Sequence, residues 1–161
     1  MRHEPDVMSA AFDRESLHKL IGVAYLITGN RDDAEDAVQD AAASTLQQAN
    51  RAEIVTPEAY LYTAVINAAR SVMRRRSLRQ KLATRLTVRP AQTAELHAYD
   101  STVLRAVQRL PARQREILVL RYWCDMTVAQ SALTLGISEA AVKSAARKGI
   151  EAIRRVVDNA N

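Results

Sequence analysis

The chain has 161 residues, a length that suits one domain or two small ones. Hydrophobic residues make up 48% of it, while Gly and Pro number only 4 each, which favours an almost wholly helical, all-α protein. The formal net charge of +5 suits a polyanionic partner. No apolar run is long enough to cross a bilayer, and the first residues lack the layout of a secretion signal. We therefore expect a cytoplasmic protein without membrane insertion.

Few residues in the chain suit catalysis or metal binding. Cys124 is the single cysteine, and the histidines at positions 3, 18 and 97 are scattered without carboxylates at ligand spacing. No nucleophile with a base and an orienting group, and no phosphate-binding loop, is found. The sequence thus predicts a protein that is not an enzyme and needs no metal or cofactor.

Two apolar periodicities near the start predict two helices, the first ending at Thr28-Gly29-Asn30. Its inward face holds Leu17, Leu20, Ile21, Ala24 and Ile27. Asn30 can cap the second helix, whose inward stripe holds Ala34, Val38, Ala41, Thr45 and Leu46. The opposite side gathers acids and an amide at helical spacing: Asp32, Glu35, Asp36, Gln39 and Asp40. Such a stripe is either a docking surface for a basic partner or an ordinary solvated face.

Thr56-Pro57-Glu58 predicts the start of a third helix, with a capping hydroxyl, a proline at the first position and an acid in the first turn. Its inward stripe holds Leu61, Ala64, Val65, Ala68 and Val72. Another side mixes an aromatic, polar groups and cations, namely Tyr60, Thr63, Asn67, Arg70 and Arg74, and the run ends with Arg75 and Arg76. This mixture suits stacking on unpaired bases and clamping of a phosphate backbone. Arginines at a helix C-terminus also complement the helix dipole, and both interpretations remain open.

Between residues 77 and 99 the periodicity fades after Leu82 and Leu86, and Pro90 and a polar stretch follow. We therefore predict a first domain over residues 1–76, a linker over 77–100 and a second domain over 101–161. The second domain is the basic one, with 10 Lys and Arg against 5 Asp and Glu. Two short helices, the second started by Pro111, are expected at the beginning of this domain, where they would support its remaining helices.

The stretch Met126 to Arg155 predicts a helix-turn-helix. Thr127 can cap its first helix, Gly136 can end that helix in the left-handed conformation, and Ser138 can cap the second. The outer face of this second helix carries Ala140, Lys143, Ser144, Arg147, Lys148 and Arg154, which are spaced to meet phosphates and base edges in a major groove. The alternative is a helical hairpin with a solvated basic face.

Three segments together resemble a known family. The runs LITGNRDDAEDAVQD at 26–40, EAYLYTAVINAARSVMRRR at 58–76, and RLPARQREILVLRYW through VKSAARKGIEAIRR are similar, in order and spacing, to the two conserved domains of extracytoplasmic-function (ECF) sigma factors of the sigma-70 superfamily. The resemblance covers about residues 17–76 and 101–155. It implies a subunit that joins core RNA polymerase, recognises a two-part promoter, starts transcription and is restrained by an anti-sigma factor.

The resemblance also implies a role for each surface. The acidic stripe, with Asp36, Gln39 and Asp40, would dock on polymerase. Asn67 and the arginines at 70–76 would approach the melted strand, with the loop at 47–56 near the flipped base. Lys143, Ser144, Arg147 and Lys148, on the helix that Ser138 caps, would contact the upstream promoter element.

Several positions depart from the family pattern. Ala42 and Leu46 replace usual aromatics, Ile66 replaces a common arginine, and Ser71 stands where Asp is frequent. Ser131 stands where Ile or Leu is usual, and Ala145 replaces a frequent arginine. We expect these changes to loosen the first core, to weaken strand capture and to lower upstream affinity. They also motivate an alternative function, that of a sigma-like protein that no longer initiates transcription and serves as an anti-sigma decoy or a stand-alone DNA-binding regulator.

Overall fold

The computed structural model describes residues 13–49, 57–86 and 101–160, and the chain divides into two compact units, Met1–Gln92 and Thr93–Asn161. Every regular element of the described residues is helical. This confirms the expected all-α fold with two helical units. The first unit holds α2 (Arg14–Thr28), α3 (Arg31–Ala49) and α4 (Pro57–Leu86), and the second holds α5 to α8 with a short π-helix.

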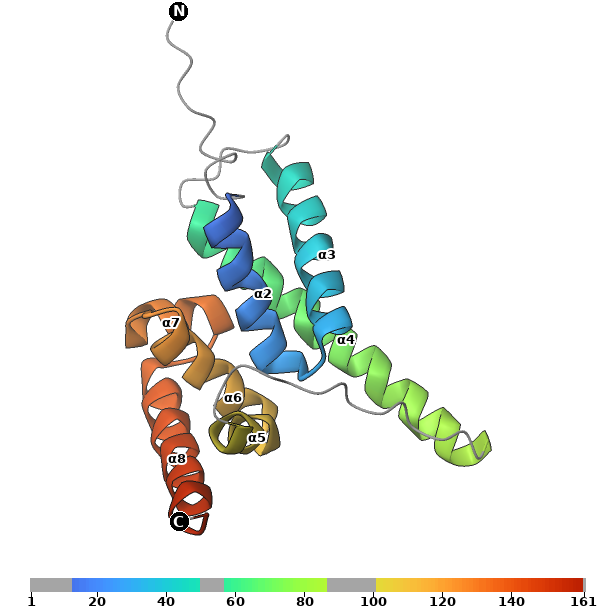
Figure 1. The fold of residues 1–161 in the computed structure, drawn as a ribbon. Helices are drawn as coiled ribbons and strands as arrows, with labels where there is room; N and C mark the ends of the chain where they lie inside the picture. Colours follow the sequence, from blue (N-terminus) through green and yellow to red (C-terminus); the bar gives the residue numbers. More distant parts are fainter. Residues whose placement is uncertain (1–12, 50–56, 87–100, 161) are drawn as a thin grey trace, which may run out of the picture. The chain divides into compact units, whose positions relative to one another are not determined.

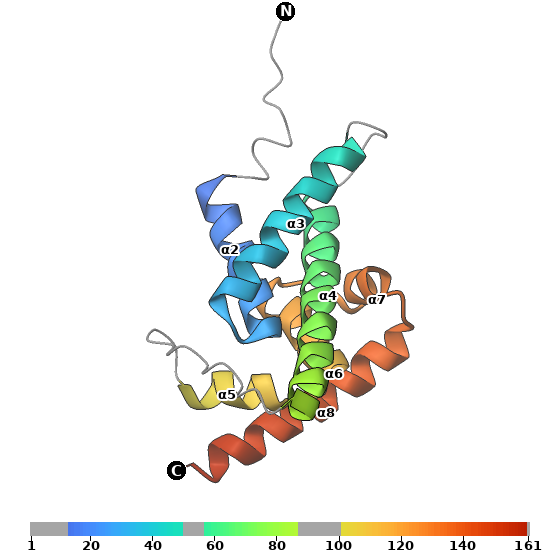
Figure 2. The same ribbon diagram turned by 90° about the vertical axis from the view of Figure 1, so that its right-hand side faces the viewer.

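In the first unit, α2, α3 and α4 pack pairwise against one another (Figure 1 and Figure 2). Asp13 caps α2 by accepting a hydrogen bond from the Ser16 amide at 2.7 Å, and Gly29 ends the helix with a φ of 71°. Asn30 then caps α3, because its Oδ1 accepts the Asp33 amide at 3.0 Å, as the sequence predicts.

The core of the first unit rests on small side chains. Its fully buried residues come from all three helices: Val23, Ala24, Ala34, Ala37, Ala41, Leu61, Val65, Ile66 and Ala69. Alanine removes little area from water, so the stabilisation depends on the close approach of the helices. The prediction that Leu17 and Leu46 are buried is wrong, because their exposed fractions are 38% and 50%. Both lie near the end of a helix, where fewer neighbours remain to cover them.

The end of α4 also differs from expectation. The predicted linker was to begin at residue 77, but α4 continues to Leu86. The segment Ser77–Leu86 contains neither Gly nor Pro and consists mostly of good helix formers, so nothing in it ends the helix. The expected linker residues 87–100 lie outside the described part of the chain.

The second unit contains α5 (Ser101–Arg109), α6 (Ala112–Leu118), the π-helix η1 (Val119–Trp123), α7 (Val128–Leu135) and α8 (Glu139–Asp158). Helices α5, α6 and α7 each pack against α8. Pro111 precedes α6 as its N-cap residue. Arg115 ties α5 to α6 by donating to the carbonyl oxygens of Gln108 at 2.7 Å and Leu110 at 2.9 Å. Burial lowers the pKa of this guanidinium, although Glu116 opposes the shift.

The helix-turn-helix forms as the local signals predict. Thr127 and Gln130 make a reciprocal capping box at the start of α7, and Gly136 ends that helix with a φ of 64°. The Ser138 hydroxyl then accepts the Ala141 amide at 3.1 Å and caps α8. Gly149, which the sequence did not single out, is buried where α8 crosses α6. A Cβ at this position would lie 2.9 Å from Leu118 Cδ1, so glycine permits the close crossing.

Candidate nucleic-acid interface

The acidic stripe lies on the outer side of α3, and the structure leaves its members in unequal surroundings. Asp32, Asp36 and Gln39 are exposed. Glu35 Oε1 accepts a hydrogen bond at 2.8 Å from Nε of Arg31, which lies one turn earlier on the same helix. Asp40 lies 3.8 Å from Arg75 of α4. The five predicted side chains therefore share one face of α3, but two of them are engaged by cations of the first unit.

Along α4, the predicted polar stripe forms one side of the helix and includes Tyr60, Thr63, Asn67, Arg70 and Arg74. Asn67 and Arg74 are exposed. Arg70 Nη1 lies 3.5 Å from Asn67 Oδ1, and Arg74 Nη2 lies 3.2 Å from Ser71 Oγ. These contacts within the helix hold the polar side chains along the stripe while leaving the stripe open to solvent.

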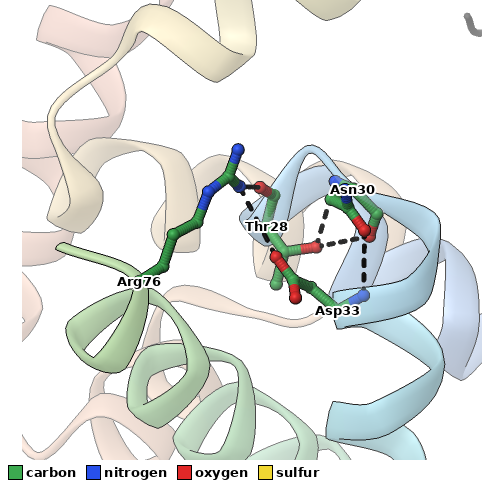
Figure 3. Close-up of polar contacts among 4 residues, drawn as sticks. All are labelled: Thr28, Asn30, Asp33 and Arg76. Carbon is green, nitrogen blue, oxygen red and sulfur yellow. Dashed lines mark hydrogen bonds and ion pairs between the residues drawn. The ribbon is translucent and has the colours of Figure 1, made fainter. Parts of the chain in front are cut away.

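The three consecutive arginines face three directions, because successive residues of a helix are about 100° apart. Arg74 belongs to the open stripe, and Arg75 turns toward Asp40 of α3. Arg76 reaches the α2–α3 turn, where its Nη1 donates to the Thr28 carbonyl oxygen at 3.0 Å and lies 3.6 Å from Asp33 Oδ2 (Figure 3). The sequence placed all three near DNA. In the structure Arg76 is engaged by the α2–α3 turn, so we expect it to stabilise the fold of the first unit.

The α2–α3 turn that Arg76 holds is itself a small hydrogen-bonded unit. Figure 3 shows the polar contacts of Thr28, Asn30 and Asp33, which belong to this turn and to the start of α3. The Thr28 hydroxyl donates to the Asn30 carbonyl oxygen at 3.0 Å and accepts the Asn30 amide at 3.4 Å. Thr28 is 2% exposed, and its carbonyl belongs to the last turn of α2, where helical acceptors lack a partner. Arg76 supplies that missing donor.

Two departures from the family pattern acquire a different meaning in the structure. Ile66 is 1% exposed, so the isoleucine that replaces the common arginine packs in the core of the first unit. The expectation that the missing arginine weakens strand capture stays a prediction. Ser131 is fully buried in α7, and its hydroxyl finds no hydrogen-bond partner among the described residues. The polar replacement therefore weakens the helix-turn-helix core.

On α8, the predicted upstream-element residues Ala140, Lys143, Arg147 and Lys148 are exposed, and Ser144 is half-buried. Ser138 is occupied in capping the helix. Lys143 and Arg147 border a shallow groove of about 400 Å³, together with Arg121, Tyr122, Glu151 and Arg154. Tyr122 is 65% exposed and was missed by the sequence reasoning. An aromatic beside cations is the signal that could have identified it.

The loop predicted near a flipped base falls mostly outside the described part of the chain, at residues 50–56. Within residues 13–49, 57–86 and 101–160, His, Cys, Asp and Glu side chains form no group of three or more that could hold a metal ion. No helix among the described residues is long and apolar enough to cross a membrane.

Two exposed basic helical faces and a helix-turn-helix define a class of DNA-binding proteins built from two helical units. Comparison with known proteins specifies that class further. The family model of sigma-70 region 2 matches residues 2–79, and that of sigma-70, region 4 matches residues 101–153. An RNA polymerase sigma-E factor from Streptomyces antibioticus is 30% identical over 128 residues, which cover 78% of this chain and 71% of the relative. The RNA polymerase sigma-E factor of Streptomyces coelicolor is 31% identical over 124 residues, covering 76% and 70%.

A solved structure shares the fold. The sigma factor RpoE from Bartonella quintana, crystallised in complex with the anti-sigma factor NepR, matches with a TM-score of 0.77 and 22% identity. The match covers 95% of this chain and 97% of that one. The chain therefore belongs to the sigma-70 family, as an RNA polymerase sigma factor of the ECF type.

Proposed function

We propose that this chain acts as a promoter-specificity subunit whose tasks are divided among three helical faces. The α3 face with Asp32, Asp36 and Gln39 docks on core RNA polymerase. The α4 stripe with Asn67, Arg70 and Arg74 holds the strand exposed by melting. The outer face of α8, with Lys143 and Arg147, contacts the upstream element. The observation that carries this division is the separation of exposed acids on α3 from exposed cations on α4 and α8.

The charge arrangement supports the proposal. An acidic face repels DNA phosphates and suits a basic protein surface, whereas exposed cations release counterions when they neutralise phosphates. Strand capture needs no catalytic residue, because stacking and phosphate contacts offset the few kcal/mol per step that unstacking costs. The protein accordingly works as a non-enzymatic subunit in the cytoplasm, where RNA polymerase acts. In this division the first unit, with α4 continued to Leu86, takes docking and melting, and the second unit takes upstream recognition.

Restraint by an anti-sigma factor is part of the same proposal. RpoE from Bartonella quintana, a protein of the same fold, was crystallised with such a partner, NepR. A partner of this kind would act by covering the proposed docking and DNA surfaces, of which Asp36 and Arg74 are exposed.

The test is equilibrium binding of the purified chain to core RNA polymerase, measured by fluorescence anisotropy in competition with a housekeeping sigma factor. Competitive binding is expected, and Asp36→Lys should weaken it. Asp36 suits this test better than Asp40, since reversal at Asp40 would also disturb Arg75. Glu15→Lys is the matched control, because Glu15 is an exposed acid on α2, away from the acidic stripe. Its ion pair with Lys19 joins two largely exposed side chains of the same helix and contributes little to stability.

Duplex binding by the second unit serves as the internal control. Asp36→Lys should leave the affinity for upstream duplex DNA unchanged, whereas Lys143→Gln should lower its salt slope by about one unit per lost phosphate contact. A folded chain that binds duplex DNA but not core polymerase would contradict the proposal. That result would support the alternative, a sigma-like protein that does not initiate transcription.

A further inference from the structure

Ser77 is an exposed serine that lies just beyond the packed part of α4. Val72, at 7% exposed, is the last buried residue of this helix among the described side chains. Every side chain from Ser77 to Leu82 is exposed, and in Figure 1 this end of α4 continues beyond the ends of α2 and α3. Within the first unit, nothing therefore buries the Ser77 hydroxyl.

Three arginines directly precede this serine. The arginines at 74–76 occupy the −3 to −1 positions relative to Ser77, and Leu78, exposed at 60%, occupies the +1 position. Serine/threonine kinases select substrates largely by charge, and arginine-directed kinases bind arginines at −3 and −2 with acidic groups of their cleft. Four serines and threonines are exposed among the described side chains, and Ser77 alone has a cation within the three residues before it. The other three are Ser44, Thr127 and Ser138.

The end of α4 can open far enough to enter a kinase cleft, in which a substrate lies extended. Opening the helix from its C-terminal end back to Arg74 uncovers no buried side chain among those described. It breaks the exposed pair of Arg75 and Asp40. It also releases Arg76 from the Thr28 carbonyl oxygen. Helix ends without tertiary cover open at little cost, so these contacts set the cost of opening.

We propose that Ser77 is a phosphorylation site for an arginine-directed serine/threonine kinase, and that the phosphate switches off strand capture by the α4 stripe. The effect on strand capture rests on the function proposed above. In the reaction, Ser77 Oγ attacks the γ-phosphorus of ATP, and the bond from that phosphorus to the β,γ-bridging oxygen breaks. ADP leaves, and the hydroxyl proton passes to the catalytic aspartate of the kinase. The chain itself supplies only the acceptor hydroxyl.

The helical register places the new phosphate among cations of α4. Arg74 precedes Ser77 by three residues and Lys81 follows it by four, spacings at which side chains of a helix meet. A phosphoserine carries about −1.5 to −2 charges near pH 7. It would pair with Arg74, which then no longer binds the strand, and it would repel the phosphates of that strand. The docking face lies on α3, so its acids keep their surroundings.

The first test identifies the phosphate acceptor. The purified chain is incubated with the catalytic domain of an arginine-directed kinase and Mg·ATP, and mass spectrometry of its peptides locates the phosphate. We expect the phosphate at Ser77 and a loss of labelling in Ser77→Ala. Ser44→Ala is the matched control, because it removes an exposed serine without preceding cations, and it should be labelled like the unsubstituted chain. Absence of phosphate at Ser77, or equal labelling of Ser77→Ala, overturns the site.

The second test measures what the phosphate does. Phosphorylated and unphosphorylated chains are each bound to core polymerase, and the complexes are then titrated with a synthetic duplex that contains a central mismatched bubble. Phosphorylation should weaken binding to the bubble roughly tenfold, because a like charge then faces the strand, and should leave the affinity for core polymerase unchanged. Ser77→Glu should weaken bubble binding in the same direction. Ser44→Glu, which adds the same charge to an exposed position of α3, should leave bubble binding unchanged.

The outcomes separate the two proposals. Equal bubble binding by the phosphorylated and unphosphorylated chains overturns the switch and leaves the proposed function standing. Loss of core binding together with bubble binding would show that the phosphate acts on docking, and overturns the assignment to strand capture. If the unphosphorylated chain binds neither core polymerase nor the bubble, the proposed function fails, whereas labelling of Ser77 in the first test still supports the modification site.

Discussion

Arg76→Gln tests whether this arginine stabilises the fold. The substitution removes a 3.0 Å charge-assisted hydrogen bond to the Thr28 carbonyl oxygen and the 3.6 Å pair with Asp33. Hydrogen bonds to charged groups contribute about 1.5–3 kcal/mol, and water can recover part of that here because the Arg76 side chain is 31% exposed. We expect a loss of about 1–2 kcal/mol. For a unit of this size, each kcal/mol shifts the unfolding temperature by about 4–8 °C, so that loss lowers it by roughly 4–16 °C.

The assay follows the stability of each unit with its own probe. Hydrogen exchange of peptides from α2 and α3 should accelerate in Arg76→Gln, while the fluorescence of Trp123, the single tryptophan, should show unchanged unfolding of the second unit. Arg74→Gln is the matched control, because Arg74 is exposed and its hydrogen bond runs to Ser71 of the same helix. It should weaken single-strand binding and leave exchange in α2 unchanged. If the two variants exchange alike and lose DNA affinity alike, Arg76 is a DNA-binding residue and our reasoning is wrong.

Three further substitutions probe single contacts. Ser131→Ala should stabilise the second unit by about 1 kcal/mol, because it removes a buried hydroxyl without a partner among the described residues. A lower midpoint of unfolding of this unit, followed by Trp123 fluorescence, would contradict this. Gly149→Ala should destabilise the same unit in thermal unfolding if the Leu118 side chain, which is 6% exposed, has no room to move away from the new Cβ, because overpacking costs about 1–3 kcal/mol against a helix-propensity gain of about 1. A raised unfolding temperature would show that Leu118 moves aside. Asp13→Ala should speed exchange at the start of α2 near neutral pH. The hydrogen bond from the Ser16 amide lowers the pKa of the Asp13 carboxyl in the folded protein. The stability that this cap adds is therefore present above the unfolded pKa and is lost as the pH falls through the folded pKa, so Asp13→Ala should no longer change the exchange rate in acid.

Local signals predicted the helix-turn-helix well. Thr127, Gly136 and Ser138 act through groups within three or four residues of themselves, so their roles depend little on the rest of the fold. The same holds for Asn30 at the start of α3. Caps and left-handed glycines are readable in a sequence for this reason.

Contacts between helices were less predictable. Periodicity identifies a face but not what covers it, so Leu46 was expected inside and is exposed, whereas Ala37 is buried. The partner of Arg76 lies 48 residues away in the chain, and no local pattern indicates such a contact. The π-helix at Val119–Trp123 was also not predicted, since this stretch contains no Gly or Pro that would mark a change of helix type.

The Arg75–Asp40 pair joins the proposed docking face to the proposed DNA face. Both side chains are more than half exposed and 3.8 Å apart, so their attraction is weak and either can exchange its partner at low cost. A cation of polymerase that approaches Asp40 would compete with Arg75, and a phosphate that approaches Arg75 would compete with Asp40. The polymerase cation would free Arg75 for a phosphate, and the phosphate would free Asp40 for polymerase, so each binding event should favour the other. The coupling free energy between them cannot exceed the modest energy of one surface ion pair. In the proposed division of tasks, we therefore expect most of the docking energy to come from Asp32, Asp36 and Gln39, and most of the strand-capture energy to come from the open stripe of α4.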